Sequence, residues 1–224
     1  MKRIIVIGEG QTEQSFCNDL LQSHFNKKSI YIENPTIKKT HGGIVNWEAL
    51  KFQIKNHLKQ DSTAIVTTLI DYYGIYEHHD YPEWKDSQGL VDKSERLTKI
   101  ETAMKNDIDV ELQGRFIPYI QLHEFEALLF SEIEVFKDNF TPQEFKDYPY
   151  LQKTIDDNPN PETINDGNET APSKRLEKII RGYRSDKESL KVIYGSLLAQ
   201  EIGLTKIRAK CSRFNSWILK LESI

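Results

Sequence analysis

The sequence has few cysteines and no long hydrophobic run. Its two cysteines, Cys17 and Cys211, stand alone within helical patterns, which excludes a cysteine metal site and predicts two buried free thiols. No window approaches the roughly 18 apolar residues of a membrane span. The apolar run behind the basic N-terminus, Ile4 to Ile7, is too short for a signal peptide. We therefore expect a cytoplasmic protein that does not enter a membrane.

Several catalytic motifs are also missing. The sequence contains no Gly-x-Ser-x-Gly elbow, no P-loop and no Cys/His nucleophile signature. Gly8-Glu9-Gly10 lacks the third glycine of a dinucleotide fingerprint, and its acid would repel a pyrophosphate. The histidines His41, His78, His79 and His123 make no recognised zinc spacing, so zinc is a minor alternative.

The composition is that of an ordinary soluble domain, but the charge is uneven. Hydrophobic residues make up 38% of the 224 residues and charged residues 29%, which is enough apolar material for a core. From Ala171 to the end there are 12 Lys/Arg against 5 Asp/Glu, whereas residues 1–170 hold 18 against 29. This asymmetry suits a metal site beside a phosphate-binding surface, and solvated Lys and Arg faces on helices explain it equally well.

Hydrophobic patterns predict strands and helices in alternation up to residue 130. Strands are expected at 2–7, 29–37, 64–70 and 115–122, and helices at 12–25, 46–59 and 92–106. Thr12 and Asn46 are the expected N-caps of two helices, and Pro118 predicts an edge strand or a bulge. Such alternation predicts an α/β fold with a mostly parallel sheet of about four strands flanked by helices.

Helical patterns dominate the rest of the chain. Capping boxes are expected at Ser131–Glu134 and Thr141–Glu144, and two apolar stripes follow at 190–202 and 207–221. We predict an α/β core over residues 1–135 and a helical C-terminal extension, packed on that core, over residues 136–224.

Acidic residues follow three of the predicted strands. Glu9 follows the first strand, Asp71 the third, and Glu124 and Glu126 the fourth. In a parallel sheet these strand ends share one edge, and converging carboxylates are the ligands that Mg²⁺ or Mn²⁺ prefers. Each acid alone is also compatible with a helix cap or a solvent-facing position. We predict metal ligation by Glu9, Asp71, Glu124 and Glu126.

The neighbouring residues refine this prediction. Glycines flank Glu9 and allow a tight turn, and Glu13 is a candidate general base or a favourable first-turn charge. If residues 123–126 are extended, Glu124 and Glu126 share one face and both can reach one ion. If a helix begins at His123, the two side chains diverge and only one can serve.

Four elements of the sequence, taken together, resemble an uncharacterised toprim-like bacterial family. They are EGQTE at 9–13, DYYG at 71–74, HEFEALLF at 123–130 and APSKRL at 171–176. The toprim fold is shared with topoisomerases, bacterial primases and the overcoming-lysogenization-defect nucleases. The resemblance implies a toprim-like fold, a catalytic glutamate at Glu9, and an Asp-x-Asp whose first member is Asp71.

The sequence departs from that pattern at one position. Tyr73 stands where the second aspartate is expected, so Glu124 or Glu126 must supply the missing carboxylate or metal binding is weak. The resemblance also implies a defence or mobile-element setting with an ATPase partner.

A basic segment near the end completes the candidate site. Ser173, Lys174 and Arg175 follow Pro172 at an expected helix start, and Arg208 and Lys210 add positive charge. A helix N-terminus beside cations suits the phosphates of DNA or RNA.

These observations leave three hypotheses. The first is a divalent-metal-dependent, phosphodiester-cleaving enzyme of the nuclease kind that uses Glu9, Glu13 and Asp71. The second is a non-catalytic module that binds a nucleic acid or an ATPase. The third is a phosphate- or nucleotidyl-transferring enzyme acting on a small molecule, which would need a closed pocket.

Overall fold

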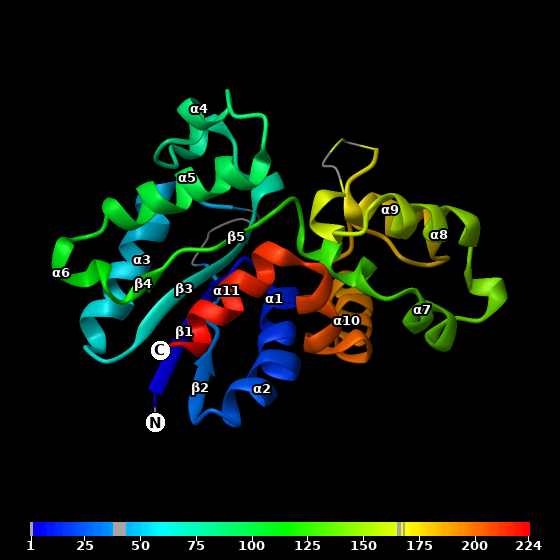
Figure 1. Cartoon of the computed structure of the whole chain (residues 1–224), viewed down its shortest axis with the longest axis horizontal. Coiled ribbons are helices and arrows are strands. Elements are labelled where there is room, and N and C mark those ends of the chain that lie inside the picture. Colours follow the sequence, from blue (N-terminus) through cyan, green and yellow to red (C-terminus); the bar gives the residue numbers. More distant parts are fainter. Residues whose placement is uncertain (1, 38–43, 165–166, 168) are drawn as a thin grey trace.

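A parallel β-sheet forms the centre of the protein (Figure 1). The computed structural model describes residues 2–37, 44–164, 167 and 169–224. The five strands of the sheet are β1 (Lys2–Gly8), β2 (Ile30–Glu33), β3 (Ile65–Asp71), β4 (Phe116–Ile117) and β5 (Ile120–Gln121). Their order is β2-β1-β3-β4, β5 also pairs with β3, and each pairing is parallel. The predicted α/β class is confirmed, and the carboxyl ends of the strands lie at one edge.

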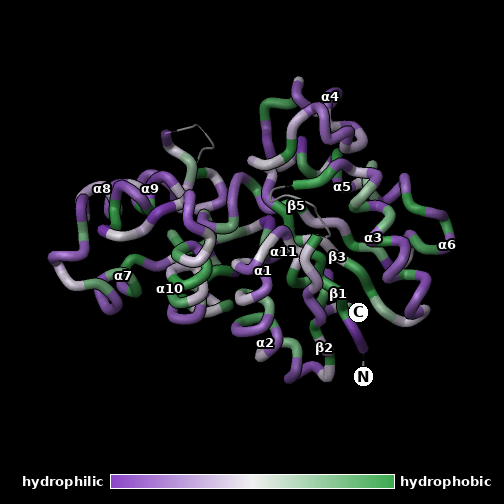
Figure 2. Tube along the Cα trace, turned by 180° about the vertical axis from the view of Figure 1, so that it is seen from behind, coloured by the Kyte–Doolittle hydropathy of each residue, from purple (hydrophilic) through white to green (hydrophobic). Residues whose placement is uncertain are grey.

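Both faces of the sheet are buried, as expected for parallel strands that read as continuous apolar runs. Ile4 and Val6 of β1 belong to one core cluster and Ile5 and Ile7 to another, because successive side chains alternate between the faces. In Figure 2 the trace along β3 includes hydrophobic stretches, in agreement with this double burial.

Helices cover the two faces separately. Residues from α1 (Gln11–Phe16), the π-helical stretch η1 (Cys17–Leu21), α2 (Gln22–Asn26), α10 (Glu188–Lys210) and α11 (Ser212–Glu222) join the first cluster. Residues from α3 (Trp47–Gln60) and α5 (Lys93–Asn106) join the second. Figure 1 shows α11 lying along the sheet on the same side as α1. The first cluster combines residues from both sides of the predicted boundary at 135.

Short helical elements make up the remaining connections. They are η2 (Tyr72–Gly74), η3 (Glu77–His79), α4 (Trp84–Ser87), α6 (Val110–Gln113), η4 (Phe125–Ser131), α7 (Ile133–Asn139), η5 (Pro142–Glu144), α8 (Tyr148–Asp157), η6 (Pro161–Thr163) and α9 (Pro172–Ile179). Across the described residues, no helix has both the length and the apolar character needed to cross a membrane.

Two of the four predicted helix caps are present in the structure. Asn46 caps α3 by accepting a hydrogen bond from the amide of Ala49, and the Thr141–Glu144 box is present. The cap at Thr12 is wrong, because α1 begins at Gln11, directly after Gly10. The box at Ser131 is wrong as well, since Glu132 caps α7.

The strand predicted at 115–122 is divided by Pro118 into β4 and β5. Proline has no amide hydrogen to donate to a ladder. Threonine hydroxyls on β3 restore the contact: Thr67 Oγ1 donates to the carbonyl of Ile117 at 2.5 Å, and Thr68 Oγ1 donates to that of Tyr119 at 2.8 Å. The sheet therefore continues past the proline and delivers residues 121–126 to its carboxyl edge.

The C-terminal helices follow the predicted stripes in part. The second stripe, from Ile207 to Leu221, is buried as expected. In the first stripe Ile193 is 60% exposed, so the buried face of α10 differs from the predicted one. Both cysteines are buried free thiols, as predicted.

Candidate functional site

The acids of β1 and β3 meet at the carboxyl edge of the sheet. Glu9 follows β1, and its Oε1 accepts a hydrogen bond from the amide of Asp71 at 2.7 Å. The turn is close-packed, since a Cβ atom added to Gly8 would stand 2.8 Å from Cβ of Glu13. A side chain at position 8 would therefore displace Glu13, which explains why a glycine is needed there.

A second hydrogen bond brings in the segment after β5. Asp71 Oδ1 accepts from the amide of Phe125 at 2.9 Å, and the amide of Tyr73 donates to the carbonyl of His123 at 3.0 Å. His123 has a φ of +66°, a left-handed conformation that is uncommon for a residue other than glycine. This bend directs residues 124–126 toward Asp71, so the three predicted strand ends are joined.

Glu126 is the most deeply buried acid of this group, with 2% of its surface exposed. Its Oε1 lies 3.0 Å from Nζ of Lys191 and accepts a hydrogen bond from the hydroxyl of Tyr183 at 3.2 Å. Its Oε2 has no hydrogen-bond partner among the described residues. A buried oxygen without a partner is costly and points to a missing ligand.

Glu124 has a different partner. Its backbone is extended and η4 begins only at Phe125, so Glu124 and Glu126 serve different neighbours and neither predicted geometry of this segment applies in full. The Glu124 carboxylate accepts hydrogen bonds from the amide and the hydroxyl of Ser173 at 2.9 and 3.1 Å. A predicted metal ligand and a predicted phosphate-binding residue are thus paired at the start of α9.

The other predicted phosphate-binding residues have internal partners or lie elsewhere. Lys174 contacts Ser185 and Glu177, and Arg175 donates to the carbonyl of Thr170. Arg208 forms a two-point ion pair with Glu222. Glu222 also contacts His24 of α2, which precedes β2, so this pair lies toward the amino ends of the strands. Lys210 is exposed at the end of α10.

The carboxylates at the edge affect one another strongly. The surrounding protein removes water from the Asp71 carboxylate, and this desolvation raises its pKa well above the usual value. Repulsion from Glu9 and Glu13 adds to the shift. Burial raises the pKa of Glu13, with repulsion from Glu126 adding to it. The same two causes raise the pKa of Glu124, and its hydrogen bonds from Ser173 oppose them.

Lys191 supplies positive charge at this site, and the sequence analysis missed it. The pKa of Lys191 is raised, mainly by Glu126 and then by Asp71, while burial opposes the shift. Helical spacing could have revealed this lysine. Lys191, Gly195 and Leu198 share one face of α10, and Leu198 is fully buried. A lysine on a buried face needs a partner acid.

The donor chemistry of the site suits a divalent metal, although the side chains do not yet enclose one. Four acids, Glu13, Asp71, Glu124 and Glu126, interact with Lys191, and carboxylate oxygens are the preferred ligands of Mg²⁺. Over the part of the chain that the structure describes, no three His, Cys, Asp or Glu side chains are already arranged to hold a metal. Glu126 Oε2 has no hydrogen-bond partner among the described residues, so the donor atoms match an ion in chemistry, but the side chains would have to move closer together to hold one.

The histidines give no support to the zinc alternative. His78 and His79 contact each other with ring centroids 4.1 Å apart, and His78 stacks on Tyr76. His123 belongs to the bend described above. His41 lies outside the described residues.

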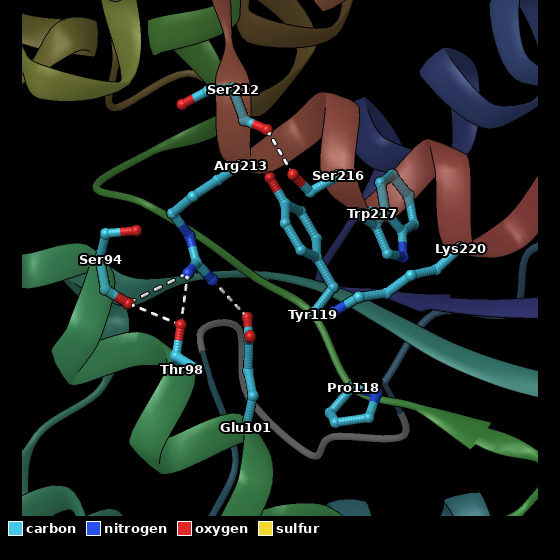
Figure 3. Close-up of a pocket in the computed structure, with 10 residues that line it drawn as sticks. All are labelled: Ser94, Thr98, Glu101, Pro118, Tyr119, Ser212, Arg213, Ser216, Trp217 and Lys220. Atoms are coloured by element: carbon cyan, nitrogen blue, oxygen red, sulfur yellow. Dashed lines mark hydrogen bonds and ion pairs between the residues drawn. The ribbon is translucent and has the colours of Figure 1, made fainter.

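A separate cavity of about 270 Å³ lies between α5, the Pro118–Tyr119 connection and α11 (Figure 3). Across it, Arg213 forms an ion pair of 2.5 Å with Glu101 and donates to Thr98 Oγ1 at 3.3 Å. The Tyr119 and Trp217 rings stack 4.6 Å apart. The Arg213 guanidinium binds Glu101 and Thr98 through its terminal nitrogens, while its buried Nε has no hydrogen-bond partner among the described residues. The cavity thus lies where α11 joins the sheet, in a different part of the molecule from the acids.

Comparison with known proteins gives a family match. Residues 8–222 match the family described as "Domain of unknown function (DUF4276)". No curated protein and no solved structure matches the chain.

Proposed function

The chain belongs to the DUF4276 family, whose description assigns no activity. We therefore propose a function from the geometry of the acidic edge, by which we mean Glu9, Glu13, Asp71, Glu124 and Glu126 at the carboxyl ends of the strands. We infer that the chain is a divalent-metal-dependent, phosphodiester-cleaving domain of the nuclease kind. The toprim-like relationship implied by the four sequence elements is part of this proposal, as are a DNA or RNA substrate, an ATPase partner and a defence or mobile-element setting.

One observation carries the proposal. Two hydrogen bonds, from the amide of Asp71 to Glu9 and from the amide of Phe125 to Asp71, tie three strand ends together. They gather acids from three separate stretches of sequence at the edge where ligands bind in parallel α/β sheets. Buried like charges oppose folding, so their convergence is better explained by a cation that they bind.

The side chains divide into distinct roles in this proposal. Glu9, Asp71 and Glu126 would hold Mg²⁺ or Mn²⁺, and the bound ion would neutralise a phosphodiester and activate water. Glu13, whose pKa is raised by burial, would take part in proton transfer. Glu124 binds the start of α9 through Ser173 and positions that helix beside the acids.

A second candidate function has an observation of its own. Tyr73 replaces the second aspartate of the toprim pattern, so position 73 supplies no carboxylate. A site with one carboxylate fewer favours a non-catalytic module that binds a nucleic acid or an ATPase. The two candidates differ in whether the chain cleaves a phosphodiester with the help of a bound metal.

The test is calorimetric titration of the chain with Mn²⁺ and Mg²⁺. Glu9→Gln, Asp71→Asn and Glu126→Gln are each expected to weaken binding at least tenfold. Glu162→Gln is the matched control, because Glu162 is also a buried glutamate but binds the amides of Arg213 and Phe214 instead.

Cleavage of single- and double-stranded DNA and RNA is then measured with and without metal. Metal-dependent cleavage that the three variants lose and the control keeps supports the nuclease proposal. Metal binding without cleavage, or no binding, rejects it and favours the binding module.

A further inference from the structure

Lys191 binds a carboxylate of the acidic edge that a metal ion would also bind. Its Nζ is 3.0 Å from Oε1 of Glu126, the acid whose other oxygen has no hydrogen-bond partner among the described residues. Asp71, Glu13 and Glu124 also interact electrostatically with Lys191. One ammonium therefore offsets part of the charge of several carboxylates.

Helix packing fixes the stem of this lysine. Gly195 is one turn further along α10, and a Cβ atom added to it would stand 3.2 Å from Cγ2 of Thr12 and 3.5 Å from Cε1 of Phe125. The absence of a side chain lets α10 approach α1 and η4 closely. Because both neighbours adjoin the acids, the start of α10 is held beside the carboxyl edge.

The head of the lysine is less confined than the acid it contacts. The Lys191 side chain is 28% exposed, whereas that of Glu126 is 2% exposed. Lysine has a flexible four-carbon stem, and its ammonium is strongly hydrated. The ammonium can therefore leave Glu126 for solvent by side-chain rotation, without unfolding α10.

We propose that Lys191 is a tethered counter-ion that competes with the divalent metal for the acidic edge. The inference rests on the proposed metal binding and deepens it, because it names what regulates the site. The ammonium occupies Glu126 in the metal-free protein and must withdraw when the ion binds. Lys191 thereby raises the metal concentration that the site requires.

Three variants test this competition. Lys191→Met removes the charge and keeps the length of the stem, and Lys191→Arg keeps the charge. Lys187→Met is the control, because Lys187 immediately precedes α10, four positions before Lys191, and is exposed. Mn²⁺ affinity is measured by calorimetry at fixed ionic strength, and thermal unfolding is measured in EDTA and in excess Mn²⁺.

Competition predicts that Lys191→Met binds Mn²⁺ about tenfold more tightly than the wild type, because an opposing charge close to the ion is gone. In EDTA the same variant melts at a lower temperature, and its increase in melting temperature on adding Mn²⁺ is larger. Lys191→Arg and Lys187→Met retain the wild-type affinity. If Lys191→Met fails to fold without metal, folding that Mn²⁺ restores supports the proposal equally.

The results that would overturn the counter-ion role differ from those that would overturn the proposed metal site. Wild-type binding with unchanged or weaker binding by Lys191→Met overturns the counter-ion role and leaves the metal site standing. An absence of binding by both proteins overturns both proposals. Binding by Lys191→Met alone supports the counter-ion role, and the cleavage assay is then run on that variant to test the proposed function.

Discussion

Replacing Asp71 by asparagine should stabilise the metal-free protein at neutral pH, although Asp71 is a proposed metal ligand. Asparagine has nearly the same shape and keeps an oxygen that can accept from the amide of Phe125, which Asp71 Oδ1 accepts at 2.9 Å. What it removes is a carboxylate charge crowded by protein atoms and repelled by Glu9, Glu13 and Glu126.

The sign and size of the effect follow from the raised pKa of Asp71. When folding raises the pKa of an acid, the folded state binds more protons, so stability falls as pH rises through the window between the two values. The wild type pays this cost above the unfolded-state pKa of about 4, and the variant does not. Each pKa unit is worth about 1.4 kcal/mol, so we expect a gain of about 1 to 2 kcal/mol at pH 8.

Urea unfolding in EDTA from pH 4.5 to pH 8.5 measures this difference. The two proteins should have nearly equal free energies of unfolding at pH 4.5, and the variant should become increasingly more stable than the wild type toward pH 8.5. In a parallel thermal unfolding experiment, each kcal/mol should raise the melting temperature by about 2 to 4 °C for a chain of this size. In excess Mn²⁺ the advantage of the variant should shrink by about 1.4 kcal/mol or more, because the wild type binds the metal at least tenfold more tightly. A variant that is less stable at every pH would refute the argument that charge repulsion dominates at Asp71.

Other predictions concern the rest of the fold. Arg213→Met should cost about 3 kcal/mol in urea unfolding because it leaves Glu101 buried without its partner, and adding Glu101→Gln should recover part of the loss; equal losses for single and double variants would contradict this. Glu162 caps α11 by accepting from the amide of Phe214, so Glu162→Ala should cost about 1 to 2 kcal/mol and speed amide hydrogen exchange at Phe214. Unchanged exchange at Phe214 would show that this cap does not protect the amide. Burial raises the pKa of the Cys17 thiol, so native protein should resist alkylation that urea permits, and rapid native labelling would show the thiol to be accessible.

The sheet was the most predictable part of the structure. Lys2–Ile7 and Ala64–Ile70 are short β-branched runs, and both became central strands within one residue of the predicted bounds. Asn46 was predictable for the same reason, since a cap depends on neighbours only three residues away. Local sequence thus determined these elements, because little else competes with an apolar run or a cap.

The limits of sequence reasoning appear where partners are distant. Lys191 and Glu126 are 65 residues apart, and Ser173 and Glu124 are 49 apart. Patterns could place each residue on a helix start or a strand end, but only packing of α9 and α10 against the sheet decides which charge meets which. For that reason Glu124 and Ser173 were assigned separate roles, and Lys191 was assigned none.

The bend at His123 links the unusual backbone to the unusual charges. Its left-handed conformation costs of order 1 kcal/mol, and it directs Phe125 and Glu126 toward Asp71. An apolar side chain in place of Glu126 would be cheaper to bury, and a relaxed backbone at His123 would be cheaper to form. The proposed cation site would give both features a role, because the bend brings Glu126 to the edge where Tyr73 supplies no carboxylate.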